Sequence, residues 1–118
     1  MTITVGDIAK ASHAVIAAMA SEFDNNQMPA WDDAEQWMRD SSIETVQASL
    51  NDPDLPNSHF HNVWMAQRIA AGWKWGPVRN NDTKENPAMV PYDELPPHQR
   101  AKDGVLKALV DSLKQHLQ

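Results

Sequence analysis

The sequence contains no cysteine, and it has only four glycines and one tyrosine in 118 residues. Without cysteine the chain forms no disulfide, uses no thiolate nucleophile and binds no zinc through sulfur. The four glycines do not form a glycine-rich motif of the kind that holds phosphate groups. These absences exclude several common classes of enzyme and metal site.

Long hydrophobic runs are also absent. No stretch approaches the roughly 20 apolar residues that span a bilayer. The apolar run Ala14–Ala20 lacks the basic flank and cleavage-like site of a secretory signal. Hydrophobic residues make up 42% and charged residues 22% of the chain, which is typical of a globular protein. We therefore expect one cytoplasmic domain over residues 1–118.

Positive charge is scarce, because the sequence has ten Lys and Arg residues and sixteen Asp and Glu residues, which gives a formal net charge of −6. This balance disfavours general nucleic-acid binding, which relies on cations that neutralise phosphates. The charge is unevenly spread, with acidic residues dense between Asp24 and Asp54. Four basic residues lie in the middle of the chain, namely Arg68, Lys74, Arg79 and Lys84. A local anion site therefore remains compatible with the composition.

The first half of the chain shows helical periodicity. A helix is predicted over Val5–Phe23, with Thr4 as N-cap and Asp7 in the first turn. Apolar residues recur at helical spacing and are expected to face the core: Ile8, Val15, Met19 and Phe23. After a loop at residues 24–29, a second helix is predicted from Asp32 or Asp33 to Leu50. Ser41 with Glu44 resembles a second capping box, so a kink or restart is expected there.

A third and a final helix are predicted in the second half. The third begins at a cap formed by Asn57 or Ser58, and Gly72 closes it in a left-handed conformation after Ala71. Pro96-Pro97 suit the first turn of the final helix. Its apolar stripe consists of Val105, Leu106, Leu109, Val110, Leu113 and Leu117.

Between these helices the helical period disappears. Trp73–Val78 alternates like a short strand, residues 80–82 read as a turn, and Ala88–Val90 is the expected returning strand. The predicted fold is therefore mainly α, with about four helices and one small β-hairpin packed on them.

The residues from His61 to Asp103 resemble the ryanodine-receptor (RyR) domain family. The matching residues are His61, Trp64, Arg68, Gly72-Trp73, Trp75-Gly76, Lys84, Pro87, Met89, Pro91–Leu95, Arg100 and Asp103. The core motif covers residues 57–104. The N-terminal helical part, residues 1–52, is similar to small stand-alone RyR-domain proteins of bacteria and phages. Three positions depart from the residues common in the family, namely Asn86, Gln99 and Trp75.

The resemblance implies a helical domain without an established reaction. In the calcium-release channels such domains lie in the cytoplasmic assembly and outside the pore. Prokaryotic members are suspected of recognising nucleotide-derived ligands. Our hypothesis is that, in a phage or its bacterial host, this chain acts as a sensor or sponge for such a signal.

Aromatic and charged residues of the core motif form the candidate ligand site. They are Trp64, Arg68, Trp73, Trp75, Arg79, Lys84, Tyr92, Asp93 and Glu94. Aromatic faces stack planar bases, and Arg or Lys beside them pairs with phosphate or carboxylate.

Each of these assignments has a structural alternative. Trp64 and Trp73 can instead fill the core, since Trp buries a large area. Arg68 and Lys84 can form structural ion pairs, with Asp93, Glu94 or Asp103 as partners of Arg68. Tyr92 can simply anchor its loop.

No catalytic residue, metal site or cofactor is predicted. His59 and His61 are two residues apart and would point in different directions on a helix, so a zinc site is not expected. His61 is expected to hydrogen-bond a neighbouring helix or loop instead.

The leading hypothesis is a non-enzymatic module that binds an anionic, nucleotide-derived ligand. One alternative is a protein-interaction module, for which homo-oligomer formation is left open. The other is a nucleotide hydrolase that uses Asp93 or Glu94.

Overall fold

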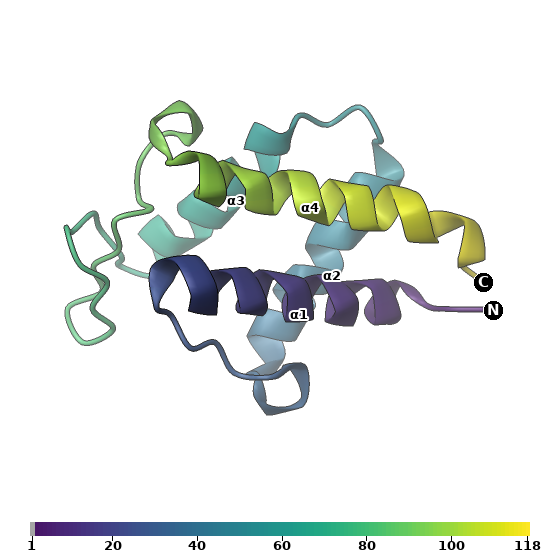
Figure 1. The fold of residues 1–118 in the computed structure, drawn as a ribbon, viewed down its shortest axis with the longest axis horizontal. Helices are drawn as coiled ribbons and strands as arrows, with labels where there is room; N and C mark the ends of the chain where they lie inside the picture. The colour runs from purple at the N-terminus through teal and green to yellow at the C-terminus, as the bar shows by residue number, and fades with distance from the viewer. Residues whose placement is uncertain (1) are drawn as a thin grey trace. The chain divides into compact units, whose positions relative to one another are not determined.

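The computed structural model describes residues 2–118 as four α-helices joined by loops and short 3-10 turns (Figure 1). The helices are α1 (Val5–Asp24), α2 (Gln36–Asn51), α3 (Asn57–Ala70) and α4 (Pro97–Leu113). The 3-10 turns are η1 (Trp31–Asp33), η2 (Tyr92–Glu94) and η3 (Lys114–His116). The predicted mainly helical fold is confirmed. Met1, part of the predicted N-terminal region, lies outside the described residues.

The chain divides into two structural units. The first unit consists of Met1–Leu55 and Gly104–Gln118, and the second consists of Pro56–Asp103. Helix α4 therefore begins in the second unit and continues into the first. The predicted organisation as a single domain stays a prediction. Within residues 2–118, no helix has both the length and the apolar character needed to cross a membrane.

Helix α1 begins as predicted. The backbone N–H of Thr4 donates to Asp7 Oδ2 at 2.9 Å, and the N–H of Asp7 donates to Thr4 Oγ1 at 3.1 Å. This reciprocal capping box satisfies two donors that the first turn leaves without a helical partner. The helix ends at Asp24, and its C-cap Asn25 has a left-handed φ of 50°. Both helix ends therefore follow from local side-chain chemistry.

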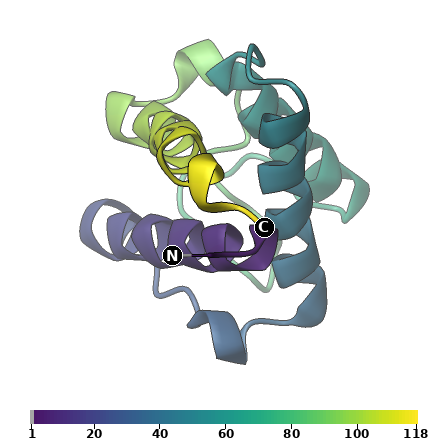
Figure 2. The same ribbon diagram turned by 90° about the vertical axis from the view of Figure 1, so that its right-hand side faces the viewer.

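The buried face of α1 differs in part from the predicted one. Its buried residues are Ile8, Ala9, Ser12, His13 and Ala20. Phe23, expected in the core, is 56% exposed. Small side chains on the buried face allow a close approach of α1 to α2 and η1, against which it packs (Figure 2). The buried hydroxyl of Ser12 donates to the carbonyl of Ile8 at 2.9 Å.

Helix α2 begins later than predicted and runs without interruption. Asp32 and Asp33 belong to η1, and the extended residue Glu35 precedes the first helical residue. The predicted restart at Ser41 is wrong, because the helix continues through it to Asn51. The hydroxyl of Thr45 donates to the Ser41 carbonyl at 2.9 Å, which is compatible with a continuous helix.

The two ends of the chain meet within the first unit (Figure 2). In α4, Leu106 and Val110 are buried one turn apart. The helix ends at Leu113, so the predicted continuation of its stripe to Leu117 is wrong. Leu117 instead pairs with Ile3 in a parallel bridge, and the Ile3 N–H donates to the His116 carbonyl at 3.0 Å.

The predicted hairpin is wrong, because residues 2–118 contain isolated bridges but no β-strand. Lys74 N–H donates to the Lys84 carbonyl at 2.9 Å, and Asn86 N–H donates to the Lys74 carbonyl at 3.0 Å. These bonds form a parallel bridge between Lys74 and Glu85. A hairpin needs antiparallel strands, so this pairing cannot be extended into one.

The rest of this segment also departs from strand geometry. Asn80 and Glu85 exchange two backbone hydrogen bonds of 2.9 and 3.0 Å and close a tight loop. Pro77 has no N–H to donate to a ladder. Residues 88–90, expected to be the returning strand, are irregular instead, with a turn at Ala88 and a bend at Val90. Residues 73–91 are therefore held by a few specific bonds and not by a sheet.

Candidate functional site

Helix α3 places two of the predicted site residues on one face. Its start is not capped by Asn57 or Ser58 as predicted, since Pro56 occupies the N-cap position without a side-chain bond. Trp64 and Arg68 are four residues apart, a spacing that brings helical side chains together. The Cζ atom of Arg68 lies 5.9 Å from the Trp64 ring centroid, within the range of a cation–π interaction.

The end of α3 brings Trp73 next to Arg68. Gly72 has a φ of +93°, which confirms the predicted left-handed residue. Its N–H donates to the Ile69 carbonyl at 3.0 Å, and the Trp73 N–H donates to the Arg68 carbonyl at 2.9 Å. This pair of bonds is a Schellman motif. It turns the chain back so that Trp73 begins the next segment beside the last turn of α3.

Arg79 completes a group of four residues. Its Cζ atom lies 5.8 Å from the Trp73 ring centroid, and its Nε donates to Asn81 Oδ1 at 3.4 Å. Two guanidinium groups thus lie over two indole rings. We refer to Trp64, Arg68, Trp73 and Arg79 as the Arg–Trp cluster.

Two causes shift the pKa of Arg68 within the cluster, namely its burial and the charge of Arg79. Arg68 is part-buried, and this burial lowers the pKa of Arg68 below its usual value. The nearby positive charge of Arg79 lowers this pKa further. Burial and a like charge both disfavour the charged form of a base. An anion bound near both groups would offset their repulsion.

His61 contacts both Tyr92 and the cluster residue Trp64. Its ring stacks on Trp64 with centroids 5.5 Å apart, and the Tyr92 ring lies 6.2 Å from it at a tilt of 54°. His61 Nε2 donates to the carbonyl of Val90 at 2.7 Å, because a carbonyl can only accept. The predicted hydrogen bond of His61 to a loop is confirmed. His61 and Arg68 both lie against the part-buried Trp64 ring, which favours a packing role for this residue.

Lys84, another predicted ligand residue, binds the end of α3. Its Nζ atom donates to the Ala71 carbonyl at 2.8 Å. A cation at this position satisfies a terminal carbonyl and suits the negative end of the helix dipole. Lys84 also has a left-handed backbone with a φ of 56°. The Lys84 amine therefore holds its loop against the end of α3.

Trp75 lies on the surface. It is 55% exposed, and the nearby Val78 is 73% exposed. Between them Gly76 is buried against Glu85. The strand predicted over Trp73–Val78 would have placed Trp73 and Trp75 on one face, and this strand does not form.

The two acidic site residues lie exposed in η2. The backbone carbonyl of Asp93 accepts from Arg100 Nη1 at 3.4 Å. An ion pair of Arg68 with Asp93, Glu94 or Asp103 stays a prediction. Asp103 is part-buried, and burial raises the pKa of Asp103 to about 7 while the charge of Lys102 opposes this rise.

Sequence reasoning missed three residues that support this site. His61 was expected to form a hydrogen bond but not to bridge Trp64 and Tyr92, although its spacing of three residues from Trp64 was a signal. Asn80 and Glu85 close the loop that directly follows Arg79. No local pattern indicates their pairing.

The described residues, 2–118, contain no group of three or more His, Asp or Glu side chains placed to hold a metal ion. The chemistry available in the Arg–Trp cluster is therefore that of guanidinium groups and aromatic rings. Such groups bind anions and planar rings through charge-assisted hydrogen bonds, stacking and cation–π contacts.

The fold and the cluster together define a mainly helical protein in which two guanidinium groups lie over two indole rings. The family model of the RyR domain matches residues 50–117, which is more than half of the chain. The chain belongs to the RyR domain family. The matched region contains the whole Arg–Trp cluster and all the other predicted site residues.

Proposed function

We propose that this chain is a non-enzymatic module that binds a small anionic, nucleotide-derived ligand at the Arg–Trp cluster. The main support is that each of the two guanidinium groups lies over an indole ring. In addition, the positive charge of Arg79 lowers the pKa of Arg68. Guanidinium groups pair with phosphate through two parallel hydrogen bonds. Two of them close together would favour a ligand with more than one negative charge.

The aromatic part of the ligand would contact Trp73 or Trp75. Trp64 is already packed against Arg68 and His61. Trp75 is 55% exposed and accessible to a planar base. A stacked base contributes about 1–3 kcal/mol in nucleic-acid complexes. The suspected recognition of nucleotide derivatives by prokaryotic RyR domains favours a nucleotide over a simple inorganic anion.

Calorimetric titration with adenine nucleotides, cyclic nucleotides and NAD-derived metabolites tests this proposal. Arg79→Ala is expected to weaken binding about tenfold or more, because it removes a charge-assisted contact. Arg79→Lys retains the positive charge but lacks the planar guanidinium that donates two parallel hydrogen bonds. This variant should therefore bind the ligand with intermediate affinity. Lys114→Ala removes an exposed cation of the first unit and serves as the control. Equal affinity for Arg79→Ala and the unmodified chain would count against the site.

The non-enzymatic part of the proposal has its own test. Each compound that binds is incubated with the protein and divalent cations, and the products are separated by chromatography. We expect the compound to be recovered unchanged. Turnover that is lost in Asp93→Asn or Glu94→Gln would support a nucleotide hydrolase instead.

Exposed apolar residues favour a second candidate function, a protein-interaction module. Trp75 and Val78 are 55% and 73% exposed on the same short loop. Exposed aromatic residues are enriched at protein interfaces. Light scattering over a concentration series would detect a homo-oligomer, and Trp75→Ala should then reduce its formation. A chain that stays monomeric and binds a nucleotide would favour the ligand-binding function.

A further inference from the structure

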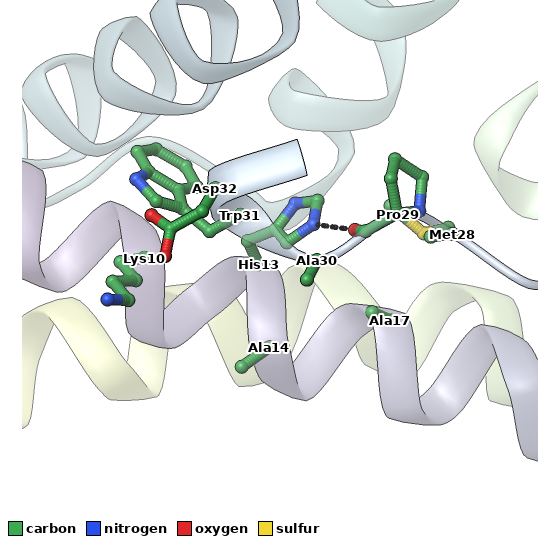
Figure 3. A pocket seen from close by; sticks show the side chains of 9 residues that line it. All are labelled: Lys10, His13, Ala14, Ala17, Met28, Pro29, Ala30, Trp31 and Asp32. Carbon is green, nitrogen blue, oxygen red and sulfur yellow. Dashed lines mark hydrogen bonds between the residues drawn. The ribbon is translucent and has the colours of Figure 1, made fainter. Parts of the chain in front are cut away.

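The first unit contains a hollow between α1 and the segment Met28–Asp32 (Figure 3). Its volume is about 380 Å³, at the lower end of the roughly 300–1,000 Å³ typical of small-molecule sites. Nine residues line it: Lys10, His13, Ala14, Ala17, Met28, Pro29, Ala30, Trp31 and Asp32. None of them belongs to the Arg–Trp cluster.

The wall of the hollow is held by specific contacts. His13 is only 7% exposed, and its Nε2 donates to the Pro29 carbonyl at 2.7 Å (Figure 3). The Trp31 ring meets His13 edge to face with centroids 5.8 Å apart. Arg39 Nη1 donates to the Trp31 carbonyl at 3.3 Å and ties the segment to α2. A ligand would therefore meet a wall that is already ordered, which lowers the entropic cost of binding.

The two ends of the hollow differ in chemistry. Met28 and Pro29 lie at one end, whereas Lys10 and Asp32 lie at the other (Figure 3). Lys10 and Asp32 are exposed. Within residues 2–118 their side-chain charges take part in no ion pair. The hollow thus combines an apolar interior with one positive and one negative group at the same end.

We infer that this hollow binds an α-amino acid with an apolar side chain. The carboxylate of the ligand would pair with Lys10 and its ammonium group with Asp32, since these two ligand charges are adjacent. The apolar side chain would lie over Ala14, whose small volume leaves room for it. A simple anion would be repelled by Asp32, and a simple cation by Lys10. The end of a peptide carries only one of the two charges.

Nuclear magnetic resonance titration of the 15N-labelled chain tests this inference, with leucine as the probe. The indole N–H of Trp31 reports on the hollow, and the backbone N–H of Arg79 reports on the Arg–Trp cluster. We expect saturable shifts at Trp31 in the millimolar range, because exposed charge pairs are weak. Leucinamide lacks the carboxylate and N-acetylleucine lacks the ammonium group, so each should bind several-fold more weakly.

Matched variants locate the binding. Ala14→Leu fills the hollow and should abolish the shifts, whereas Ala18→Leu places the same side chain at an exposed position of α1 outside the lining. Asp32→Asn should weaken binding about three- to fivefold, and Asp33→Asn is its control because Asp33 does not line the hollow.

Two outcomes would overturn the inference: no saturable shift at Trp31 with leucine, or unchanged binding to Ala14→Leu. Shifts confined to Arg79 would also contradict it. Because the two reporters lie in different units, failure here is distinguishable from failure of the nucleotide site.

Discussion

At the scale of single residues, the contacts of the two arginines differ in kind. Arg68 is four residues from Trp64 on one helix, so their contact follows from helical geometry. Arg79 lies over Trp73 from across an irregular loop. The position of the Arg79 guanidinium therefore depends on whatever holds that loop, and Gly76 and Glu85 are part of it.

Gly76→Ala is expected to destabilise the chain. An added Cβ would lie 2.5 Å from Glu85 Oε2 and 2.6 Å from Glu85 Cβ, so the backbone would have to shift. Overpacking of this kind costs about 1–3 kcal/mol. Thermal unfolding should show a lower midpoint, and any nucleotide bound near Arg79 should bind more weakly.

Gly6→Ala is the matched control for this substitution. Its added Cβ would lie 3.6 Å from Thr4 Oγ1, an ordinary contact, and Gly6 is within α1. Alanine in a helix is about 0.5–1 kcal/mol more favourable than glycine, so the unfolding midpoint should rise slightly. Equal midpoints for the two variants would contradict the close packing of Gly76.

Asp103 should make stability depend on pH. Burial raises the pKa of Asp103 from 3.8 to about 7, with Lys102 opposing. Between these values the folded chain holds a proton that the unfolded chain has lost, so stability falls as pH rises. This contribution is complete below about pH 4 and is lost above about pH 7.

Asp103→Asn removes this titration. At about pH 8 the variant should be more stable on the order of 1 kcal/mol, well below the full linkage value because solvent screens a part-buried group. At about pH 4 the two proteins should have nearly equal midpoints of chemical unfolding. Asp111→Asn, on the exposed side of α4, is the control. A stabilisation that does not change with pH would contradict the assigned pKa.

At the scale of elements, the end of α3 organises the site. The Schellman bonds at Gly72 and Trp73 and the Lys84 amine all satisfy carbonyls of its last turns. The same bonds turn the chain so that the backbone of Trp73 lies beside that of Arg68. Termination of this helix and construction of the Arg–Trp cluster thus depend on the same few residues.

Gly72→Ala is expected to cost about 1–2 kcal/mol, because a φ of +93° is unfavourable for a residue with a Cβ. The added Cβ would lie 3.8 Å from the nearest Lys84 atom, so steric overlap does not contribute. Asn tolerates left-handed backbone better, so Gly72→Asn should be less destabilising. Denaturant unfolding measures both. Equal stability of Gly72→Ala and the unmodified chain would contradict the left-handed assignment.

At the scale of the whole molecule, the family match and the two structural units have different boundaries. The RyR match covers residues 50–117, which include all of the second unit and the α4 part of the first. The hollow at α1 lies outside the matched residues. Binding of an amino acid there would thus be a property of this chain in addition to its family fold.

The bridge between the chain ends is expected to stabilise the first unit. A chain that ends at His116 loses the Gln118 N–H bond to the Ile3 carbonyl, 3.2 Å long, and the packing of Leu117. We expect a loss of about 1–2 kcal/mol in the free energy of unfolding. Leu117→Ala keeps the backbone bonds and should lose less. No change in the shortened chain would show that the bridge contributes nothing.

Local signals in the sequence were sufficient for the helices and for several of their ends. The capping box of Thr4 and Asp7 and the left-handed Gly72 were predicted correctly, because their partners lie within a few residues. The hairpin was wrong because alternation at Trp73–Val78 says nothing about the partner of Lys74, which is Glu85 in a parallel bridge. Phe23 was misplaced because periodicity alone does not determine which face of α1 meets α2.

The sequence by itself therefore determined the helical class, the RyR family and the residue types of the candidate site. Only the tertiary structure decided that Arg79 lies over Trp73, that His61 contacts both Trp64 and Tyr92, and that a hollow forms beside His13. Helix ends depend on bonds between near neighbours, which a sequence displays directly. Sites depend on distances between residues far apart in the chain, and those distances exist only after the loops have packed.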